Sequence, residues 1–235
     1  MLLNCRISAP GKVILHGEHS VVFGKDALVS SIGLRTQLYL LEKENTSCIS
    51  VEFPNLQFKI ETTLDDVNIF LESSKNTPEL IRSFIMQRFK RSNEIENNTL
   101  VAFFFVLSKA FGQQKVKTAF NISLTSDLTI GAGSGSSAAF GVCIATAFLL
   151  LARKITDPYF EHLDLISNLA FESEKIMHLS PSGVDNTICT YGGILKFAKG
   201  QGFSKISIPK QNKLNVLLVD SGVSRNTANL VAHYF

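Results

Sequence analysis

One stretch of the chain constrains its fold more than any other: a glycine- and serine-rich loop that runs directly into a long apolar segment. Residues 131–139 read Gly-Ala-Gly-Ser-Gly-Ser-Ser-Ala-Ala, and residues 140–154 contain no proline and one glycine. Glycines let a backbone approach a ligand closely, and a helix N-terminus directs N–H groups and partial positive charge at an anion. The stretch therefore predicts a phosphate-binding loop followed by a buried helix.

Two familiar phosphate motifs do not fit this loop. The Walker A pattern ends in glycine, lysine and serine or threonine, and that ending is absent here. The Rossmann fingerprint requires the spacing G-x-G-x-x-G and an acidic residue about 20 positions later. Here the glycines occupy alternate positions, and residues 151–154 offer no carboxylate. A glycine-rich loop that packs beneath a helix and binds nothing remains the alternative.

Composition excludes several classes of protein. Hydrophobic residues make up 45% of the 235 residues and charged residues 18%, which is typical of a folded chain with a core. The net charge of +3 is not clustered, so we expect no nucleic-acid partner. The best apolar run, residues 140–152, is shorter than the roughly 18 residues that span a bilayer, so we expect no membrane segment. Scattered cysteines and the lack of a signal-like N-terminus predict a cytoplasmic protein.

The periodicity of apolar residues predicts a mixture of strands and helices. Alternating or β-rich runs predict strands at residues 5–8, 13–15, 36–41, 49–53, 117–123 and 215–219. Apolar spacing of the helical kind predicts helices at residues 78–91, 100–111, 140–154, 159–177 and 226–235. We expect Ala9-Pro10-Gly11 to break the first strand, and the polar residues 42–47 to form a turn between strands of an antiparallel sheet. Asp157-Pro158 supplies a helix start.

One carboxylate stands out by its position on a predicted helix. Glu174 lies four residues after Ala170 on the apolar stripe of the segment 159–177, whereas Glu172 faces roughly the opposite way. A carboxylate on an apolar stripe is costly unless it is paired or bound to a metal. The pattern therefore indicates either a metal ligand or a buried salt bridge, for which Lys12 and Arg225 are candidate partners.

Several blocks in the order of the chain resemble one kinase superfamily. They are residues 10–24 (PGKVILHGEHSVVFG), the loop 131–137, residues 181–186 (PSGVDN), residues 191–193 (YGG) and residues 225–227 (RNT). Together they resemble the galactokinase, homoserine kinase, mevalonate kinase and phosphomevalonate kinase (GHMP) superfamily, and most of all its mevalonate kinase branch. The sequence departs from the family near Thr129-Ile130, where proline is usual, and at Ser134, where a larger apolar residue is usual.

The resemblance implies an α+β fold in two parts. Residues 1–204 would form the ATP-binding N-terminal domain, a mixed sheet with packed helices, and residues 205–235 the beginning of a ferredoxin-like C-terminal domain. Family members are longer and carry a third glycine-rich motif with no counterpart here. We expect the strand at 215–219 to pair with another chain, as in a homodimer, to exchange between protomers, or to be poorly ordered. Without the third motif, we expect weak magnesium-ATP binding and slow turnover.

The activity implied by the resemblance is phosphorylation of mevalonate at its 5-hydroxyl, with ATP and Mg²⁺ as cofactors, a step of isoprenoid and sterol biosynthesis. Alternatives are another small-molecule kinase of the superfamily, of the phosphomevalonate kinase or galactokinase type, and a catalytically silent nucleotide-binding regulatory protein. A bare structural module that binds no ATP is a further alternative. In each enzyme reading, the partner is a small molecule.

The resemblance also implies roles for particular residues. Asp185 and Lys12 would be catalytic, although an aspartate after a glycine turn is also a common helix cap. Ser137 and Glu174 would hold the metal. The nucleotide would contact Lys12, Asn55, Ser126, Gly131, Ala132, Gly133, Ser134, Gly135, Ser136 and Ser137. The acceptor would contact Glu18, His19 and Thr227, although Glu18 and His19 could equally be an exposed turn pair.

Overall fold

The computed structural model describes residues 1–18, 20–73, 77–90, 93–156, 159–178, 181–207, 217 and 219. The predicted helix at 226–235, the helix start at Asp157-Pro158, and the candidate residues His19, Arg225 and Thr227 lie outside this part. So does the predicted strand at 215–219 apart from two isolated residues. The second-domain fragment and its boundary at residue 205 therefore stay predictions.

Seven strands of the described part form one mixed sheet. They are β1 (Asn4–His16), β2 (Ala27–Lys43), β3 (Cys48–Phe53), β4 (Phe58–Thr63), β5 (Ala119–Ser126), β6 (Ile194–Ala198) and β7 (Gly202–Lys205). Their order is β4-β3-β5-β2-β6-β7, with β1 also paired to β2. The pair β3–β5 is parallel and the other pairs are antiparallel. This mixed sheet with packed helices confirms the α+β class.

The long strand β2 organises the sheet around the glycine loop. Its C-terminal part, Thr36–Lys43, pairs with β5, and its N-terminal part, Ala27–Ser30, pairs with β6. Because β1 pairs with both parts of β2, β5 and β6 must share the opposite edge. The backbone N–H of Asp127 still donates to the carbonyl of Arg35 (2.9 Å), just after β5 ends. The chain therefore enters the glycine loop halfway along β2.

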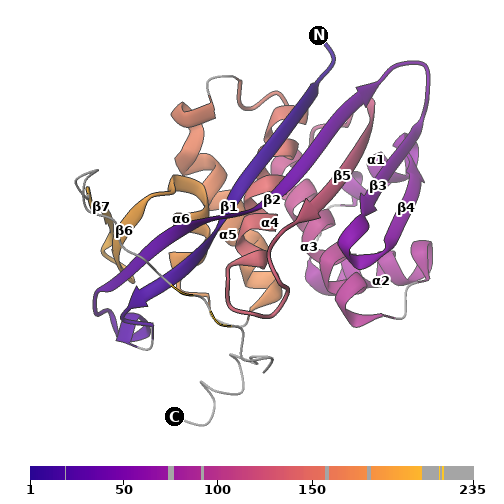
Figure 1. Ribbon diagram of the computed structural model, residues 1–235. Helices are drawn as coiled ribbons and strands as arrows, with labels where there is room; N and C mark the ends of the chain where they lie inside the picture. The colour runs from indigo at the N-terminus through magenta and orange to yellow at the C-terminus, as the bar shows by residue number, and fades with distance from the viewer. Residues whose placement is uncertain are drawn as a thin grey trace.

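Helices cover one face of this sheet. They are α1 (Leu64–Glu72), α2 (Pro78–Phe89), α3 (Glu94–Phe111), α4 (Ser136–Leu151), α5 (Leu163–Met177) and α6 (Val184–Tyr191), with short 3-10 helices at Ser20–Phe23, Pro54–Leu56 and Tyr159–His162. Figure 1 shows α3, α4 and α5 behind the sheet. The opposite face carries half-exposed side chains such as Tyr39 and Leu41. Within the described residues, no helix is both long and apolar enough to cross a membrane.

Two sequence-based expectations about strands were wrong. Ala9-Pro10-Gly11 does not end the first strand, because β1 continues to His16 with a register shift between Pro10 and Lys12. Within the described residues β1 pairs with β2 alone, and proline, which lacks an N–H, is tolerated on such an edge strand. The strands at 36–41 and 49–53 are not neighbours either, since β5 lies between β2 and β3. Glu42 belongs to β2 rather than to a turn.

The helix predictions that fall in the described residues, at 78–91, 100–111, 140–154 and 159–177, were confirmed with shifted ends. The apolar segment after the glycine loop is α4, which begins at Ser136 instead of residue 140, so the last serines of the loop form its first turn. The segment 159–177 divides into a 3-10 turn and α5. Helices α3 and α4 pack together, with Phe103 and Phe148 edge to face at 4.9 Å between ring centroids. The predicted buried helices thus form the centre of the core.

Two leucines on neighbouring helices differ in burial, so truncation to alanine should lower the free energy of unfolding by different amounts. Leu100 on α3 is 0% exposed, whereas Leu80 on α2 is 53% exposed. We expect Leu100→Ala to lower the free energy of unfolding by about 2–5 kcal/mol through lost burial and an unfilled cavity. Leu80→Ala should cost at most about 0.5 kcal/mol. Urea denaturation of both variants measures the difference, and equal costs would contradict the described packing of α3.

Candidate active site

The glycine loop between β5 and α4 has a left-handed backbone at each of its glycines. Gly131, Gly133 and Gly135 all have left-handed φ angles, from 74° to 81°. Gly135 is the N-cap of α4, and the first bond within that helix runs from the Ala139 N–H to the Gly135 carbonyl (2.9 Å). The N–H groups of Ser136 and Ser137 have no carbonyl partner within the helix. The loop and helix start therefore provide N–H donors for an anion.

Strand β1 holds this loop in place. The N–H of Lys12 donates to the Ser134 carbonyl (2.8 Å). A β-carbon added at Gly135 would lie 2.7 Å from Cγ of Lys12, and one at Gly11 would lie 2.8 Å from the Ser134 carbonyl oxygen. These close approaches require glycine at both positions. The stem of Lys12 thus packs directly against the loop.

Lys12 and Asp185 form the central ion pair of the site. Nζ of Lys12, a residue only 8% exposed, lies 3.0 Å from Oδ1 of Asp185. Asp185 is the second residue of α6, and the N-cap of that helix is Gly183 with φ 87°. The interpretation of Asp185 as a helix cap was therefore wrong. The predicted pairing of Lys12 with Asp185 is confirmed.

Glu174 lies on α5 behind this pair and is almost fully buried, at 2% exposed. Its Oε2 is 3.7 Å from Nε2 of His178, and Oε1 has no hydrogen-bond partner in the described residues. Burial, reinforced by the charge of Asp185, raises the pKa of Glu174 to about 7, against the lowering effects of Ser137 and Lys12. Among described residues Glu174 forms no ion pair with Lys12, so that salt-bridge alternative was wrong. The other proposed partner, Arg225, lies outside the described part.

The contrast with Glu172 confirms the argument from helical periodicity. Glu172, two residues earlier, forms an ion pair with Lys175 at 2.5 Å, away from the site. Glu174 instead faces Ser137, so the glycine loop and α5 bring one hydroxyl and one carboxylate together. Hydroxyl and carboxylate oxygens are ligands that magnesium prefers. Because Oε1 of Glu174 has no hydrogen-bond partner in the described residues, it could serve as a ligand of such a cation.

Sequence reasoning missed two residues of this cluster. His178, the C-cap of α5, places Nε2 3.3 Å from Oγ of Ser137, and desolvation of its half-covered ring lowers its pKa. Cys189 directs its Sγ at the Gly135 carbonyl (4.0 Å), and burial raises the pKa of this thiol well above its usual value. Both lie four residues after a predicted site residue, Glu174 or Asp185. That helical spacing could have identified them.

The remaining candidates lie around this centre. The side-chain amide of Asn55 donates to the Ser126 carbonyl (3.0 Å) and accepts from the Ser126 N–H (2.8 Å), so these two predicted nucleotide contacts meet at the end of β5. The N–H of Ala132 and the hydroxyl of Ser134 both donate to the Thr129 carbonyl, at 3.5 and 3.4 Å. Glu18 is exposed in the turn after β1. Of the three predicted acceptor contacts, Glu18 alone falls in the described part.

Comparison with known proteins agrees with this geometry. Residues 98–193 match the family model of the GHMP kinases N terminal domain. This match includes the glycine loop, α4 and α6, so the part of the chain that forms the site is similar to the GHMP kinases.

Within that superfamily the similarity is to mevalonate kinases. The chain is 35% identical to the mevalonate kinase of Mus musculus over 247 residues, which cover 96% of this chain and 61% of that relative. The Methanococcus jannaschii mevalonate kinase matches 87% of this chain and 56% of its own, at 25% identity and a TM-score of 0.65. The L. major mevalonate kinase in complex with R-mevalonate shares the fold, at 22% identity and a TM-score of 0.59 over 88% of this chain and 53% of its own. The chain thus spans about three fifths of the curated relatives' length.

The raised pKa of Glu174 predicts a pH-dependent effect on stability. Because the folded protein binds this proton more tightly than the unfolded chain, Glu174 favours folding below about pH 4.5, and this contribution is lost as pH rises towards 7. Without divalent cations, Glu174→Gln should therefore raise the free energy of unfolding at pH 8 by about 3 kcal/mol.

Urea denaturation in EDTA at pH 8 and pH 4 tests this expectation. The gain should vanish at pH 4, where the carboxyl is protonated in both states. Glu172→Gln is the matched control, because Glu172 lies on the same helix in an exposed ion pair. A stability of Glu174→Gln equal to that of the parent at pH 8 would contradict the described burial.

Proposed function

We propose that the protein is a mevalonate kinase, which transfers the γ-phosphoryl group of ATP to the 5-hydroxyl of mevalonate. The observation that carries the proposal is the Lys12–Asp185 pair at 3.0 Å, beside a glycine loop and the start of a helix. Phosphoryl transfer requires a phosphate cradle, a metal ion, a group that orients the acceptor hydroxyl, and positive charge. The similarity to mevalonate kinases over 96% of the chain, one of the structural relatives being a complex with R-mevalonate, supports this substrate.

The glycine loop would bind the nucleotide phosphates. Gly131, Gly133 and Gly135 have positive φ, and no atom beyond the chain neighbours lies within 4 Å of where a β-carbon would stand at Gly131 or Gly133. The backbone is thus open to an approaching phosphate. The start of α4 adds its partial positive charge. Asn55 and Ser126, at the entry of this loop, are proposed to contact the nucleotide.

Ser137 and Glu174 would hold magnesium. The orphaned Oε1 of Glu174 and the hydroxyl of Ser137 match the hard oxygen ligands of this ion. When bound, the ion neutralises charge on the phosphates. His178, whose Nε2 lies near both side chains, would orient the Ser137 hydroxyl.

Asp185 and Lys12 would act on the acceptor hydroxyl and the transferring group. The ammonium group of Lys12, 3.0 Å from Asp185, would offset negative charge that builds up during transfer. The Asp185 side chain is 33% exposed, so its carboxylate could accept the proton of a substrate hydroxyl. Because phosphoryl transfer is largely dissociative, its main role would be to orient that hydroxyl. Glu18, His19 and Thr227 are proposed on the acceptor side.

We place this enzyme in the cytoplasm and regard a small molecule as its main partner. The four cysteines are free thiols, of which Cys143 and Cys189 are buried, as expected of a chain in a reducing compartment.

The roles of Asp185 and Glu174 predict kinetic defects of different kinds. Asp185→Asn should lower kcat for mevalonate by roughly 10²–10⁴-fold with nearly unchanged magnesium-ATP affinity, because the lost interaction belongs to the transition state. Glu174→Gln should instead raise the magnesium concentration required. The measurement is ADP release with mevalonate, galactose, homoserine or phosphomevalonate as acceptor. A higher rate with another acceptor would mean that mevalonate is not the substrate. Equal magnesium dependence of the two variants would contradict the roles proposed for Asp185 and Glu174.

The glycine loop predicts a selective loss of nucleotide binding. Gly133→Val should weaken binding of magnesium-ATP at least about tenfold, since a β-branched side chain at φ 74° strains the loop and occupies the phosphate approach. Gly112→Val is the matched control, because Gly112 also has positive φ and open space but lies before β5, at the opposite end of that strand from the loop. Calorimetry should show normal binding for Gly112→Val. Normal binding by folded Gly133→Val would remove this loop from the site.

A further inference from the structure

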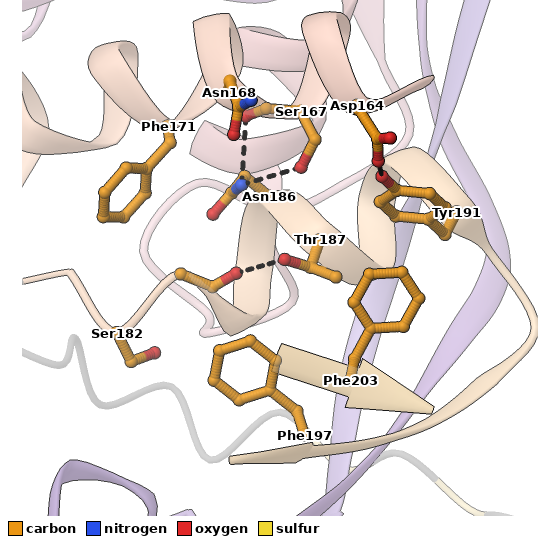
Figure 2. Close-up of a pocket in the computed structure, with 11 residues that line it drawn as sticks. Asp164, Ser167, Asn168, Phe171, Ser182, Asn186, Thr187, Tyr191, Phe197 and Phe203 are labelled. Atoms are coloured by element: carbon orange, nitrogen blue, oxygen red, sulfur yellow. Dashed lines mark hydrogen bonds between the residues drawn. The ribbon is translucent and has the colours of Figure 1, made fainter. Parts of the chain in front are cut away.

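A second concave site lies on the far side of α6 from the Lys12–Asp185 pair. It is a cavity of about 320 Å³ between α5, α6 and the β6–β7 hairpin (Figure 2). Its lining is partly aromatic and partly polar: Asp164, Ser167, Asn168, Phe171, Ser182, Gly183, Asn186, Thr187, Tyr191, Phe197 and Phe203. This size and this mixture are typical of small-molecule sites.

A buried amide with one unsatisfied end faces the cavity. Asn186 is 4% exposed, and its Nδ2 donates to the carbonyl and to Oγ of Ser167, both at 3.1 Å. Its Oδ1 has no hydrogen-bond partner among the described residues. A buried acceptor without a donor is costly, so such groups are usually paired with a ligand, water or protein group. The amide orientation is fixed by Ser167, which leaves the oxygen for an occupant.

Two aromatic rings lie on the same side of Gly183 as this oxygen. A β-carbon placed at Gly183 would lie 3.9 Å from Asn186 Oδ1, 3.6 Å from the Phe171 ring and 3.8 Å from the Phe197 ring. In Figure 2 the oxygen of Asn186 points into the space between Phe171 and Phe197. Phe203 lies against Tyr191 at 4.5 Å between ring centroids and forms another wall. A planar apolar body with one N–H or O–H donor matches this arrangement.

The charge of the lining distinguishes this cavity from a phosphate site. Its one ionisable carboxylate is Asp164, which accepts a hydrogen bond from the Tyr191 hydroxyl. Burial, with help from Asp164, raises the pKa of Tyr191 to about 12, so the phenol stays protonated. No lysine, arginine or histidine is among the lining residues, although Lys175 and Lys205 stack on the rings of Phe171 and Tyr191. The interior thus favours neutral or cationic ligands over anions.

Helical geometry separates the two sites. Asp185 and Cys189, four residues apart on α6, face Lys12 and Gly135. Gly183, Thr187 and Tyr191 follow a second stripe at the same spacing and face the cavity. Asn186 nevertheless follows Asp185 directly and ties α6 to α5, the helix that carries Glu174. An occupant of the cavity would therefore touch the two helices that position the candidate catalytic groups.

We propose that this cavity binds a small planar apolar molecule that donates an N–H or O–H hydrogen bond to Asn186 Oδ1 and carries no negative charge, such as an aryl amine. The site is additional to the proposed kinase site, and its occupancy is measurable without any kinase activity.

Tryptamine is a suitable probe, because it has an indole N–H and an ammonium group on about 12 non-hydrogen atoms. Titration of the ¹⁵N-labelled protein should shift the backbone amides of Gly183, Thr187, Tyr191 and Phe203 with a dissociation constant in the millimolar range. Indole-3-propionate, which has the same ring and a carboxylate, should bind about tenfold more weakly. Shifts confined to residues 131–137, no shift at all, or equal binding of the two probes would overturn the proposal.

Variants of Asp164 and Asn186 test the charge of the lining and the hydrogen bond to Asn186 Oδ1 separately. Asp164→Asn keeps an acceptor for Tyr191 and should remove most of the preference for tryptamine over indole-3-propionate. Asn186→Leu should abolish tryptamine binding. Ser167→Ala should retain it, because this variant removes one of the hydrogen bonds that hold the Asn186 amide but leaves Oδ1 in place. Circular dichroism checks that each variant is folded.

If Asn186→Leu does not fold, Phe203→Ala serves as a second test. It removes one exposed wall of the cavity and should weaken indole binding, whereas Phe23→Ala, outside the lining, should not. Indole binding that survives both Phe203→Ala and, where folded, Asn186→Leu would overturn the proposal.

Discussion

A buried ammonium group must have a carboxylate beside it, and in this protein that requirement joins three segments that are distant in the sequence. Lys12 comes from an edge strand and Asp185 from a short helix more than 170 residues later, and the two meet at 3.0 Å. The backbone of Lys12 holds the glycine loop through Ser134, and its stem packs on Gly135. Loss of either charge would leave the other partly buried and unpaired, which is strongly destabilising. The same pair thus stabilises the site and is the centre of the proposed chemistry.

Around this pair the protein keeps a second carboxylate without a counter-charge of its own. Glu174 shares the field of Lys12 with Asp185, and burial disfavours its ionised form. Such an arrangement lowers the stability of the metal-free protein and favours a cation next to Ser137. If Glu174 binds the proposed magnesium, its unfavourable burial without the metal is a loss of stability accepted for function. It also explains why a glutamate occurs on an otherwise apolar helical stripe.

Each of the helices α5 and α6 carries a candidate site residue on one face and lines the aromatic cavity with another. One face of α6 carries Asp185 towards β1, and the other lines the aromatic cavity with Thr187 and Tyr191. Asn186 joins α6 to α5 by two hydrogen bonds to Ser167. The distance between Asp185 and Glu174 therefore depends on how these helices pack, and a ligand in the cavity would act on that packing. The proposed kinase site and the cavity are therefore adjacent to the same short helix.

Local sequence determined the parts of this protein that depend on neighbouring residues. The glycine- and serine-rich stretch predicted a loop that runs into a buried helix, and helical periodicity placed Glu174 apart from Glu172. The order of several motifs indicated the superfamily. Local sequence did not determine strand pairing: β5 lies between β2 and β3, and β1 continues through Pro10, because an edge strand tolerates a residue without an N–H. Only the tertiary structure placed His178 against Ser137 and left Asn186 Oδ1 unpaired among phenylalanines. Those features arise from packing between segments far apart in the chain, and no local pattern specifies that packing.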